Sequence, residues 1–157
     1  MTALKSLFFL IFVPGTVMGY VPYLIAAHDV ELFQTGVLRY FAFPLWLVSS
    51  AAVVWCFWNF TVNGRGTPAP IDPPKELVAV GLYRFVRNPM YVAGIVAMIG
   101  WVFWSPSLSM ILTPILFFTA AHIFVTFYEE PTLKKKFGAA YEDYLKRVPR
   151  WIPRFSR

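Results

Sequence analysis

MYVAGIVAMIGWVFW (90–104), SPS (105–107) and LSMILTPILFFTAAHIFVTFY (108–128) form two apolar runs joined by a short turn. At about 1.5 Å per residue, a helix over the first run is about 22 Å long and one over the second is about 31 Å long. Such a short turn predicts an antiparallel helical hairpin. The hairpin brings the residues before 90 and after 128 together at one membrane face, where the chain has its richest set of charged and hydrogen-bonding side chains.

Two further apolar segments precede the hairpin, at Leu4–Ala27 and Val37–Val62. Both reach the roughly 20 residues that a spanning helix needs. The composition agrees, with 58% apolar, 19% aromatic and only 14% charged residues. We therefore expect an all-α integral membrane protein with about four transmembrane helices. The third helix, Met90–Trp104, is short and either crosses a thinned region, borrows flanking residues or stays buried among its neighbours.

The chain is interpreted as one membrane domain over residues 1–157, with two scaffold spans in 1–62 and a functional core in 63–153. The proline-rich segment Asn63–Pro74 cannot continue a helix and is interpreted as a cytoplasmic loop or lid. After Pro131, apolar residues recur at helical spacing, which predicts an amphipathic cytoplasmic helix that ends at Pro149.

Basic residues set the expected orientation, because Lys and Arg near span ends are retained in the cytoplasm. All of them except Arg39 fall on one side of a four-span arrangement, which predicts cytoplasmic termini and a cytoplasmic site. The net charge of +6 is attributed to this bias and to anionic lipid headgroups, with nucleic acid a weaker alternative. A cleaved signal peptide is the alternative for the first segment, whose apolar length exceeds that of a signal core.

Cysteine and histidine usage gives no reason to expect a metal site. Cys56 is the single cysteine and lies within the second span, so it is interpreted as an apolar packing residue. The two histidines are far apart in the sequence.

Asn88-Pro89 is a helix start signal, because Asn is a favoured N-cap and Pro suits the first helical position. Arg87 lies beside the positive end of that helix, which predicts an anion site suited to a carboxylate or a phosphate. Tyr83 and Tyr91 add aromatic faces, so the set suits an adenosine-bearing ligand. The alternative is an interfacial arginine beside an ordinary cap.

Glu129 and Glu130 are expected to close the fourth span, where carboxylates are costly and capping cannot explain them. His122, Thr126 and Glu130 are spaced by four and therefore share one helix face. A buried, hydrogen-bonded histidine is the simplest interpretation of His122. The alternative is that the acidic residues and His122 form an ion path.

KELVAVGLYRFVRNPMY (75–91), EE (129–130), RVP (147–149) and Pro153 together resemble the isoprenylcysteine carboxyl methyltransferase family. Related membrane phospholipid methyltransferases share the general pattern. The resemblance covers about half the chain, residues 75 to 153. It implies a membrane enzyme that transfers a methyl group from S-adenosylmethionine to a lipophilic or amphiphilic acceptor in the bilayer.

The resemblance also implies roles for individual residues. The S-adenosylmethionine site comprises Lys75, Glu76, Leu77, Val78, Tyr83, Arg87, Asn88, Pro89, Met90, Tyr91 and Glu129. Of these, Lys75 to Val78 would border the cofactor, and Glu129 would bind its amino group. Arg147 and Glu130 are the candidate catalytic residues.

Two positions depart from the family pattern. Asn88 stands where the family usually has His, and Val125 stands where the isoprenylcysteine enzymes carry a substrate-binding arginine. The acceptor therefore stays open between a carboxylate, a thiol and an amine. An amine would need a base, for which Glu130 and His122 are candidates.

The alternatives to this function are a phospholipid N-methyltransferase, an ion-coupled transporter subunit and a non-catalytic scaffold. The sequence leaves the oligomeric state undetermined.

Overall fold

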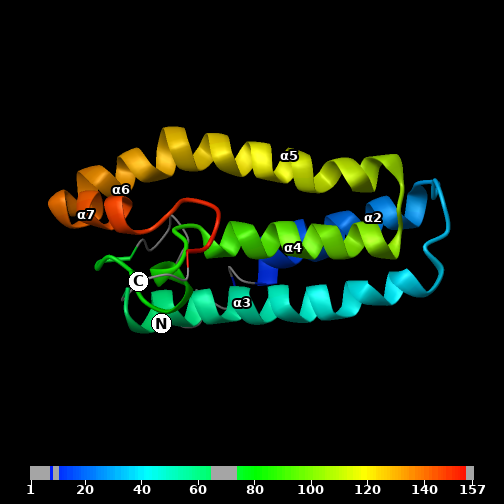
Figure 1. The fold of residues 1–157 in the computed structure, drawn as a ribbon, viewed down its shortest axis with the longest axis horizontal. Helices are drawn as coiled ribbons and strands as arrows, with labels where there is room; N and C mark the ends of the chain where they lie inside the picture. The colour runs from blue at the N-terminus through cyan, green and yellow to red at the C-terminus, as the bar shows by residue number, and fades with distance from the viewer. Residues whose placement is uncertain (1–7, 9–10, 65–73, 155–157) are drawn as a thin grey trace.

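The computed structural model describes residues 8, 11–64 and 74–154, and these form a bundle of long helices (Figure 1). Residues Ile11–His28 form one helical segment that contains the π turn η1 (Thr16–Tyr20) and α2 (Val21–His28). The 3-10 turn η2 (Gly36–Phe41) leads into α3 (Ala42–Val62), and η3 (Gly81–Arg84) precedes α4 (Pro89–Trp104). The chain continues as α5 (Leu108–Phe124), the π turn η4 (Val125–Glu129), α6 (Glu130–Phe137) and α7 (Ala139–Arg147).

The expected all-α membrane architecture is confirmed. Among the residues that the structure describes, three helical segments are long and apolar enough to span a bilayer, at Ile11–His28, Gly36–Val62 and Leu108–Phe137. The shorter apolar helix Pro89–Trp104, for which the sequence left three alternatives, packs between them (Figure 1). Large apolar side chains such as Phe12, Leu47 and Phe127 are exposed on the outside of the bundle, which suits contact with lipid. The expected start of the first span at Leu4 and most of the proline-rich loop (65–73) lie outside the described residues.

Small and polar residues hold α4 against α3. Ser49 Oγ donates to the Ala93 carbonyl at 2.8 Å, and Trp46 Nε1 donates to the Ala97 carbonyl at 3.1 Å. Ala93 and Ala97 are buried, so the two helix backbones approach closely, as is usual for helices that pack in a membrane. These contacts fix the depth of α4 in the bundle and therefore the position of its first turn.

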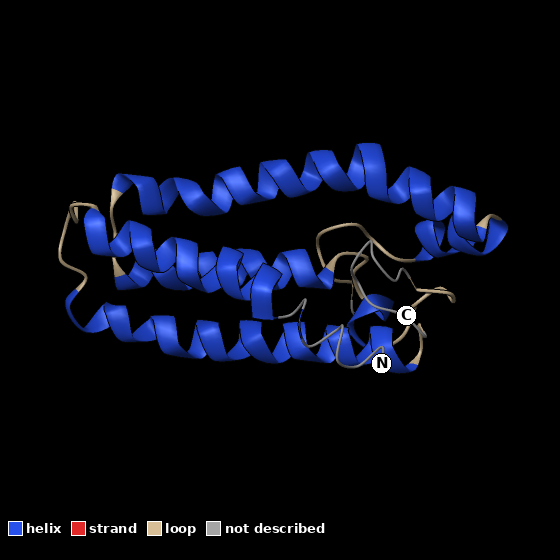
Figure 2. Cartoon of the chain, turned by 180° about the vertical axis from the view of Figure 1, so that it is seen from behind, coloured by secondary structure: helices blue, strands red, loops and turns tan. Residues whose placement is uncertain are grey.

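The turn between α4 and α5 closes one end of the bundle, opposite to the end at which α6 and α7 lie (Figure 2). Ser107 caps α5 by accepting from the Met110 N–H at 3.1 Å. Arg39 donates to the Trp104 carbonyl at 3.2 Å, and its guanidinium lies 4.8 Å from the centre of the Trp104 ring. Arg39 therefore has a structural partner at this end, away from the other basic residues.

The fourth helix is longer than the sequence indicated, which corrects one expectation. Helix continues from Leu108 through the π turn η4 to Phe137, so Glu129 and Glu130 lie inside it rather than at its end. Pro131, which lacks an N–H, comes just after the π turn, where the regular hydrogen-bond pattern of the α-helix is already interrupted. The turn to α7 occurs at Gly138, whose φ of +54° favours glycine. Contrary to what the sequence had suggested, these two carboxylates therefore do not lie at the negative end of a helix dipole.

Candidate functional site

The site is built around Glu129, a carboxylate at the end of the π turn η4. Tyr91, in the first turn of α4, donates its hydroxyl hydrogen to Glu129 Oε2 at 3.1 Å. The hairpin thus brings together two residues that are 38 positions apart in the sequence. A π turn widens a helix locally and is frequent at functional sites. Here it lies immediately before the charged turn of the fourth helix.

Glu129 lines a small cavity, which we call the polar cavity, between the η3 segment and α6–α7. The cavity has about 40 Å³ of open space, enough for a few water molecules. Its walls are Phe60, Pro74, Leu77, Val78, Tyr83, Arg87, Asn88, Glu129, Glu130, Leu133, Phe137, Tyr141 and Tyr144. The polar cavity therefore contains most of the predicted cofactor residues.

Glu130 also lines the polar cavity, but its carboxylate is paired with two arginines. Arg87 Nη1 lies 2.9 Å from Glu130 Oε1, and both side chains are 13% exposed. Arg150 binds the same carboxylate through two hydrogen bonds, from Nε at 2.9 Å and from Nη2 at 2.7 Å, and donates to Thr126 Oγ1 at 3.2 Å. Bidentate pairs of this kind are strong and fix the geometry of both groups.

Arg150 belongs to a C-terminal segment, 148–154, which we call the strap because it joins α5–α6 to the start of α4. The Arg87 N–H donates to the Pro149 carbonyl at 2.9 Å, and the Arg154 N–H donates to the Phe85 carbonyl at 3.0 Å. Trp151 Nε1 donates to His122 Nδ1 at 3.1 Å. His122 thus has a hydrogen-bond partner, in line with its interpretation as a satisfied histidine. The sequence did not predict a role for the strap, because its basic and aromatic residues follow the last predicted helix and fit no helical pattern.

The prediction that the Asn88 side chain caps α4 with a hydrogen bond is wrong. Helix α4 begins after Asn88 with Pro89 in its first turn, as expected, but the Asn88 side chain makes no capping hydrogen bond. Its Nδ2 donates instead to the Arg150 carbonyl at 3.1 Å. The Asn88 side chain therefore binds the strap instead of capping the helix as the local sequence pattern had predicted.

Tyr83 belongs to η3 and is buried, with α7 on one side of it. Tyr144 donates its hydroxyl hydrogen to the Tyr83 carbonyl at 2.7 Å, and the Phe60 ring meets the Tyr83 ring edge-on at 5.4 Å. Burial raises the pKa of Tyr83 well above its usual range, so its hydroxyl stays protonated. The segment is positioned by Gly81, where φ is +59° and a Cβ would lie 2.7 Å from Asn59 Nδ2.

The remaining predicted residues separate into two groups. Leu77 and Val78 line the polar cavity. Lys75 and Glu76 are exposed, and their N–H groups donate to the Gly64 carbonyl at 2.8 and 3.4 Å. Arg147 is also exposed, with Nε bonded to the Asp143 carbonyl at 3.2 Å, and it does not line the cavity. The structure therefore brings Arg150, and not Arg147, to the predicted catalytic glutamate.

A second cavity lies on the other side of Tyr91, and we call it the apolar cavity. It has about 180 Å³ of open space between the first helix, α3, α4 and α5. Its walls are Val13, Pro14, Val17, Met18, Val53, Phe57, Met90, Tyr91 and Phe117. Met90 therefore faces this cavity, and the Tyr91–Glu129 pair stands between the two cavities.

The polar groups and aromatic rings that line the polar cavity fit an amino-acid zwitterion linked to an aromatic base. Glu129 suits an ammonium group, and the Phe60 and Tyr83 rings suit an aromatic base. Arg87 is already paired with Glu130, but its buried Nε has no hydrogen-bond partner among the described residues and suits a carboxylate. Ligands of this size occupy pockets of about 300–1,000 Å³. The chemistry therefore fits, and binding requires the walls of the cavity to separate.

Comparison with known proteins gives three findings. Residues 37–140 match the model of the phospholipid methyltransferase family. The chain is 31% identical over 103 residues (66% of this chain, 44% of the relative) to a nickel-cobalt-cadmium resistance protein, NccN, of Alcaligenes xylosoxydans xylosoxydans. It is 39% identical over 80 residues (48% of this chain, 29% of the relative) to methanethiol S-methyltransferase 2 of Bradyrhizobium diazoefficiens. The chain thus spans less than half the length of these two relatives.

Proposed function

The chain belongs to the phospholipid methyltransferase family, and from this membership we propose that it is a membrane methyltransferase that uses S-adenosylmethionine. The observation that carries the proposal is the Tyr91–Glu129 pair, which joins a polar cavity to an apolar one. A methyl donor with charged ends and an acceptor with an apolar body require two such compartments in contact. The exposed apolar surface of the helices is consistent with an acceptor that arrives from the bilayer.

In this proposal the residues of the polar cavity bind and orient the donor. Glu129 accepts hydrogen bonds from the ammonium group, and Tyr91 fixes the orientation of the carboxylate. The free Nε of Arg87 binds the carboxylate. When bound, S-adenosylmethionine supplies a sulfonium methyl: the acceptor's lone pair forms the new bond to carbon while the carbon–sulfur pair returns to sulfur. The protein contributes orientation and exclusion of water.

The ion pairs of Glu130 with Arg87 and Arg150 affect which methyl acceptor the site favours. Glu130 is bound by two guanidinium groups, and His122 Nδ1 accepts the Trp151 N–H. Both candidate bases are therefore engaged, which favours an acceptor that needs none, such as a thiolate or a carboxylate. A thiol acceptor is also consistent with the name of the Bradyrhizobium relative; the thiol would lose its proton to water before transfer and react as the thiolate. Methyl transfer to a phospholipid amine remains the alternative, and it would require Glu130 to leave its arginines.

We assign Glu130 and Arg150 to positioning, and Arg147 stays a predicted catalytic residue without a contact that supports it. The proposed orientation places the polar cavity and both termini in the cytoplasm, by the distribution of Lys and Arg. A reporter fused to the C terminus that reads as external would contradict this orientation.

The proposed activity is tested with purified protein, methyl-labelled S-adenosylmethionine and three acceptors: an alkanethiol, a prenylated cysteine and phosphatidylethanolamine. We expect label in the thiol or the carboxylate and at least a hundredfold slower transfer by Glu129→Gln. Label in phosphatidylethanolamine alone would select the alternative acceptor. No transfer to any of them, together with no binding of S-adenosylmethionine, would overturn the proposal.

A further inference from the structure

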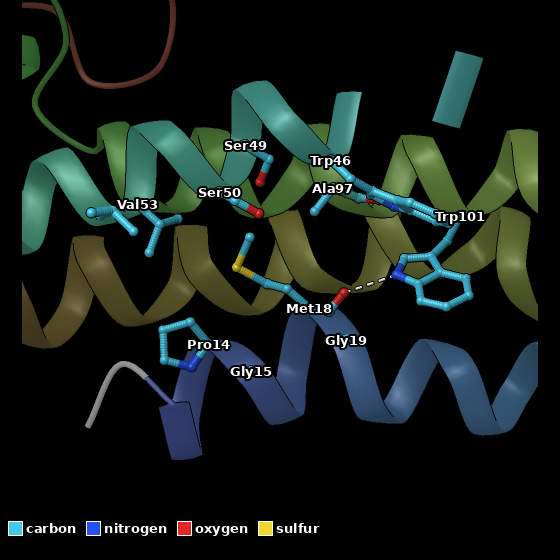
Figure 3. A pocket seen from close by; sticks show the side chains of 11 residues that line it. Pro14, Gly15, Met18, Gly19, Trp46, Ser49, Ser50, Val53, Ala97 and Trp101 are labelled. Atoms are coloured by element: carbon cyan, nitrogen blue, oxygen red, sulfur yellow. Dashed lines mark hydrogen bonds between the residues drawn. The ribbon is translucent and has the colours of Figure 1, made fainter. Parts of the chain in front are cut away.

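A third hollow adjoins the apolar cavity on the side away from Tyr91. It is a groove of about 390 Å³ between the first helix and the α3–α4 pair, and we call it the lipid-facing groove. Figure 3 shows Pro14 and Met18 on one wall and Ser49, Val53 and Trp101 on the other. Pro14, Met18 and Val53 line both this groove and the apolar cavity, so the two spaces adjoin.

The walls of the groove are mostly apolar, and three of their four polar side chains, those of Trp46, Ser49 and Trp101, are turned to backbone carbonyls. Trp101 Nε1 donates to the Met18 carbonyl at 2.8 Å (Figure 3). Trp46 Nε1 donates to the Ala97 carbonyl, and Ser49 Oγ donates to the Ala93 carbonyl. With these donors engaged, the wall offers hydrocarbon and ring faces, and the Ser50 hydroxyl is its remaining polar side chain. A headgroup would lose its hydrogen bonds to water there, whereas a hydrocarbon chain loses nothing.

The groove and the apolar cavity lie along α4, from Trp101 to Tyr91. These two residues are ten positions apart, which is about 15 Å along a helix. With C–C bonds of about 1.5 Å, an extended zigzag chain of roughly a dozen carbons covers this length. The tryptophans Trp46 and Trp101, with ring centres 4.8 Å apart, stand at the far end.

We propose that the apolar cavity and the lipid-facing groove together bind the hydrocarbon chain of the methyl acceptor and select acceptors by chain length. The inference rests on the proposed function and names the substrate class: a single-chain amphiphile of about twelve carbons whose reactive group lies at the Tyr91–Glu129 pair. Trp46 and Trp101 stop the chain, so longer chains bind more weakly. The walls bury one chain, and a second chain would remain outside.

The test uses Gly19, which lines the groove and has no atom within 4 Å of the position of an added Cβ. Gly19→Leu therefore fills the groove without a backbone clash. The matched control is Ala51→Leu, since Ala51 is exposed on α3 and lines a different hollow. The probe is a twelve-carbon alkanethiol with a diazirine near its methyl end, photolysed with the full-length protein in nanodiscs and mapped by mass spectrometry.

We expect labels on peptides that contain Met18 and Trp101, reduced at least fivefold by Gly19→Leu and unchanged by Ala51→Leu. Labels spread over outward-facing residues such as Leu47 and Phe127 would show bulk lipid and overturn the proposal. So would a crosslink between two copies of the chain at the groove, or labelling that Gly19→Leu leaves unchanged.

A kinetic comparison separates this inference from the proposed function. For dodecanethiol, Gly19→Leu should lower kcat/KM at least tenfold, while ethanethiol turnover and binding of S-adenosylmethionine stay within twofold of wild type. Equal losses for both thiols would overturn length selection and leave the methyltransferase proposal intact. If the wild type methylates neither thiol and binds no S-adenosylmethionine, the proposed function fails, and the labelling map still decides whether the groove holds a single chain.

Discussion

Glu129 and Glu130 are neighbours of the same type, yet they face two different regions of the molecule. Glu129 meets one tyrosine hydroxyl and lines the wall between two cavities. Glu130 is held by Arg87 and Arg150 and anchors the strap. A charged side chain is thus available to a ligand only when the fold leaves it without a strong internal partner. We therefore expect substitutions at Glu130 to affect mainly stability and those at Glu129 to affect mainly binding.

The largest expected effect on stability is that of Glu130→Gln. Removing the charge leaves two largely buried arginines without their counter-ion, which costs about 3–5 kcal/mol. For a chain of this size the melting temperature in detergent should fall by about 10 °C. A fall below about 2 °C would show that the arginines have other counter-ions and would remove the distinction between the two glutamates.

A smaller loss is expected for Arg150→Leu. This change removes the bonds to Glu130 and Thr126, but Arg87 still neutralises Glu130, so the expected cost is about 1–3 kcal/mol. Arg150→Lys should restore only part of it, because an ammonium group cannot form the bidentate pair. Complete rescue by Lys in a thermal unfolding assay would contradict the bidentate geometry.

On the Glu129 side, Tyr91→Phe should weaken binding and leave stability nearly unchanged. The lost hydrogen bond orients a carboxylate, and its expected value of about 1 kcal/mol corresponds to roughly a fivefold increase in the Kd for S-adenosylmethionine. Fluorescence or calorimetric titration measures this change. An unchanged Kd would indicate that Glu129 is oriented by something other than Tyr91.

The smallest effect is expected for Glu142→Gln, which serves as a surface control. The hydrogen bond and charge of Lys134, 2.8 Å away, lower the pKa of Glu142, and both side chains are exposed. A depressed pKa means that any stabilisation is present above the usual pKa of a glutamate and is lost as the pH falls through the lowered value. The melting temperature at pH 7 should change by less than about 1 °C. A drop as large as that of Glu130→Gln would show that the melting temperature does not distinguish a buried ion pair from an exposed one in this protein.

The sequence predicted the features that depend on local pattern. Apolar length predicted the spans, including the short α4, and the spacing of four placed His122, Thr126 and Glu130 on one face. The contacts of these residues with the strap agree with that placement. The antiparallel hairpin correctly predicted that Tyr91 and Glu129 would be close.

The features that the sequence did not predict depend on tertiary partners. The Asn88 side chain leaves its local capping position for the Arg150 carbonyl, which belongs to a segment 62 residues away. Arg147 and Arg150 have the same charge in the sequence, but α7 ends at Arg147, and the strap then turns Arg150 toward Glu130. The helix continues past Glu129 through a π turn, which no residue pattern indicated.

The most direct test of the central claim is a calorimetric titration of S-adenosylmethionine into the wild type, Glu129→Gln and Glu130→Gln, at a temperature where all three are folded. We expect Glu129→Gln to raise the Kd at least about tenfold, because it removes the charge that the ammonium group binds, while its melting temperature stays near that of the wild type. Glu130→Gln should show the reverse, with a lower melting temperature and a smaller change in Kd. Wild-type affinity in Glu129→Gln would contradict the assignment of this carboxylate to the donor site.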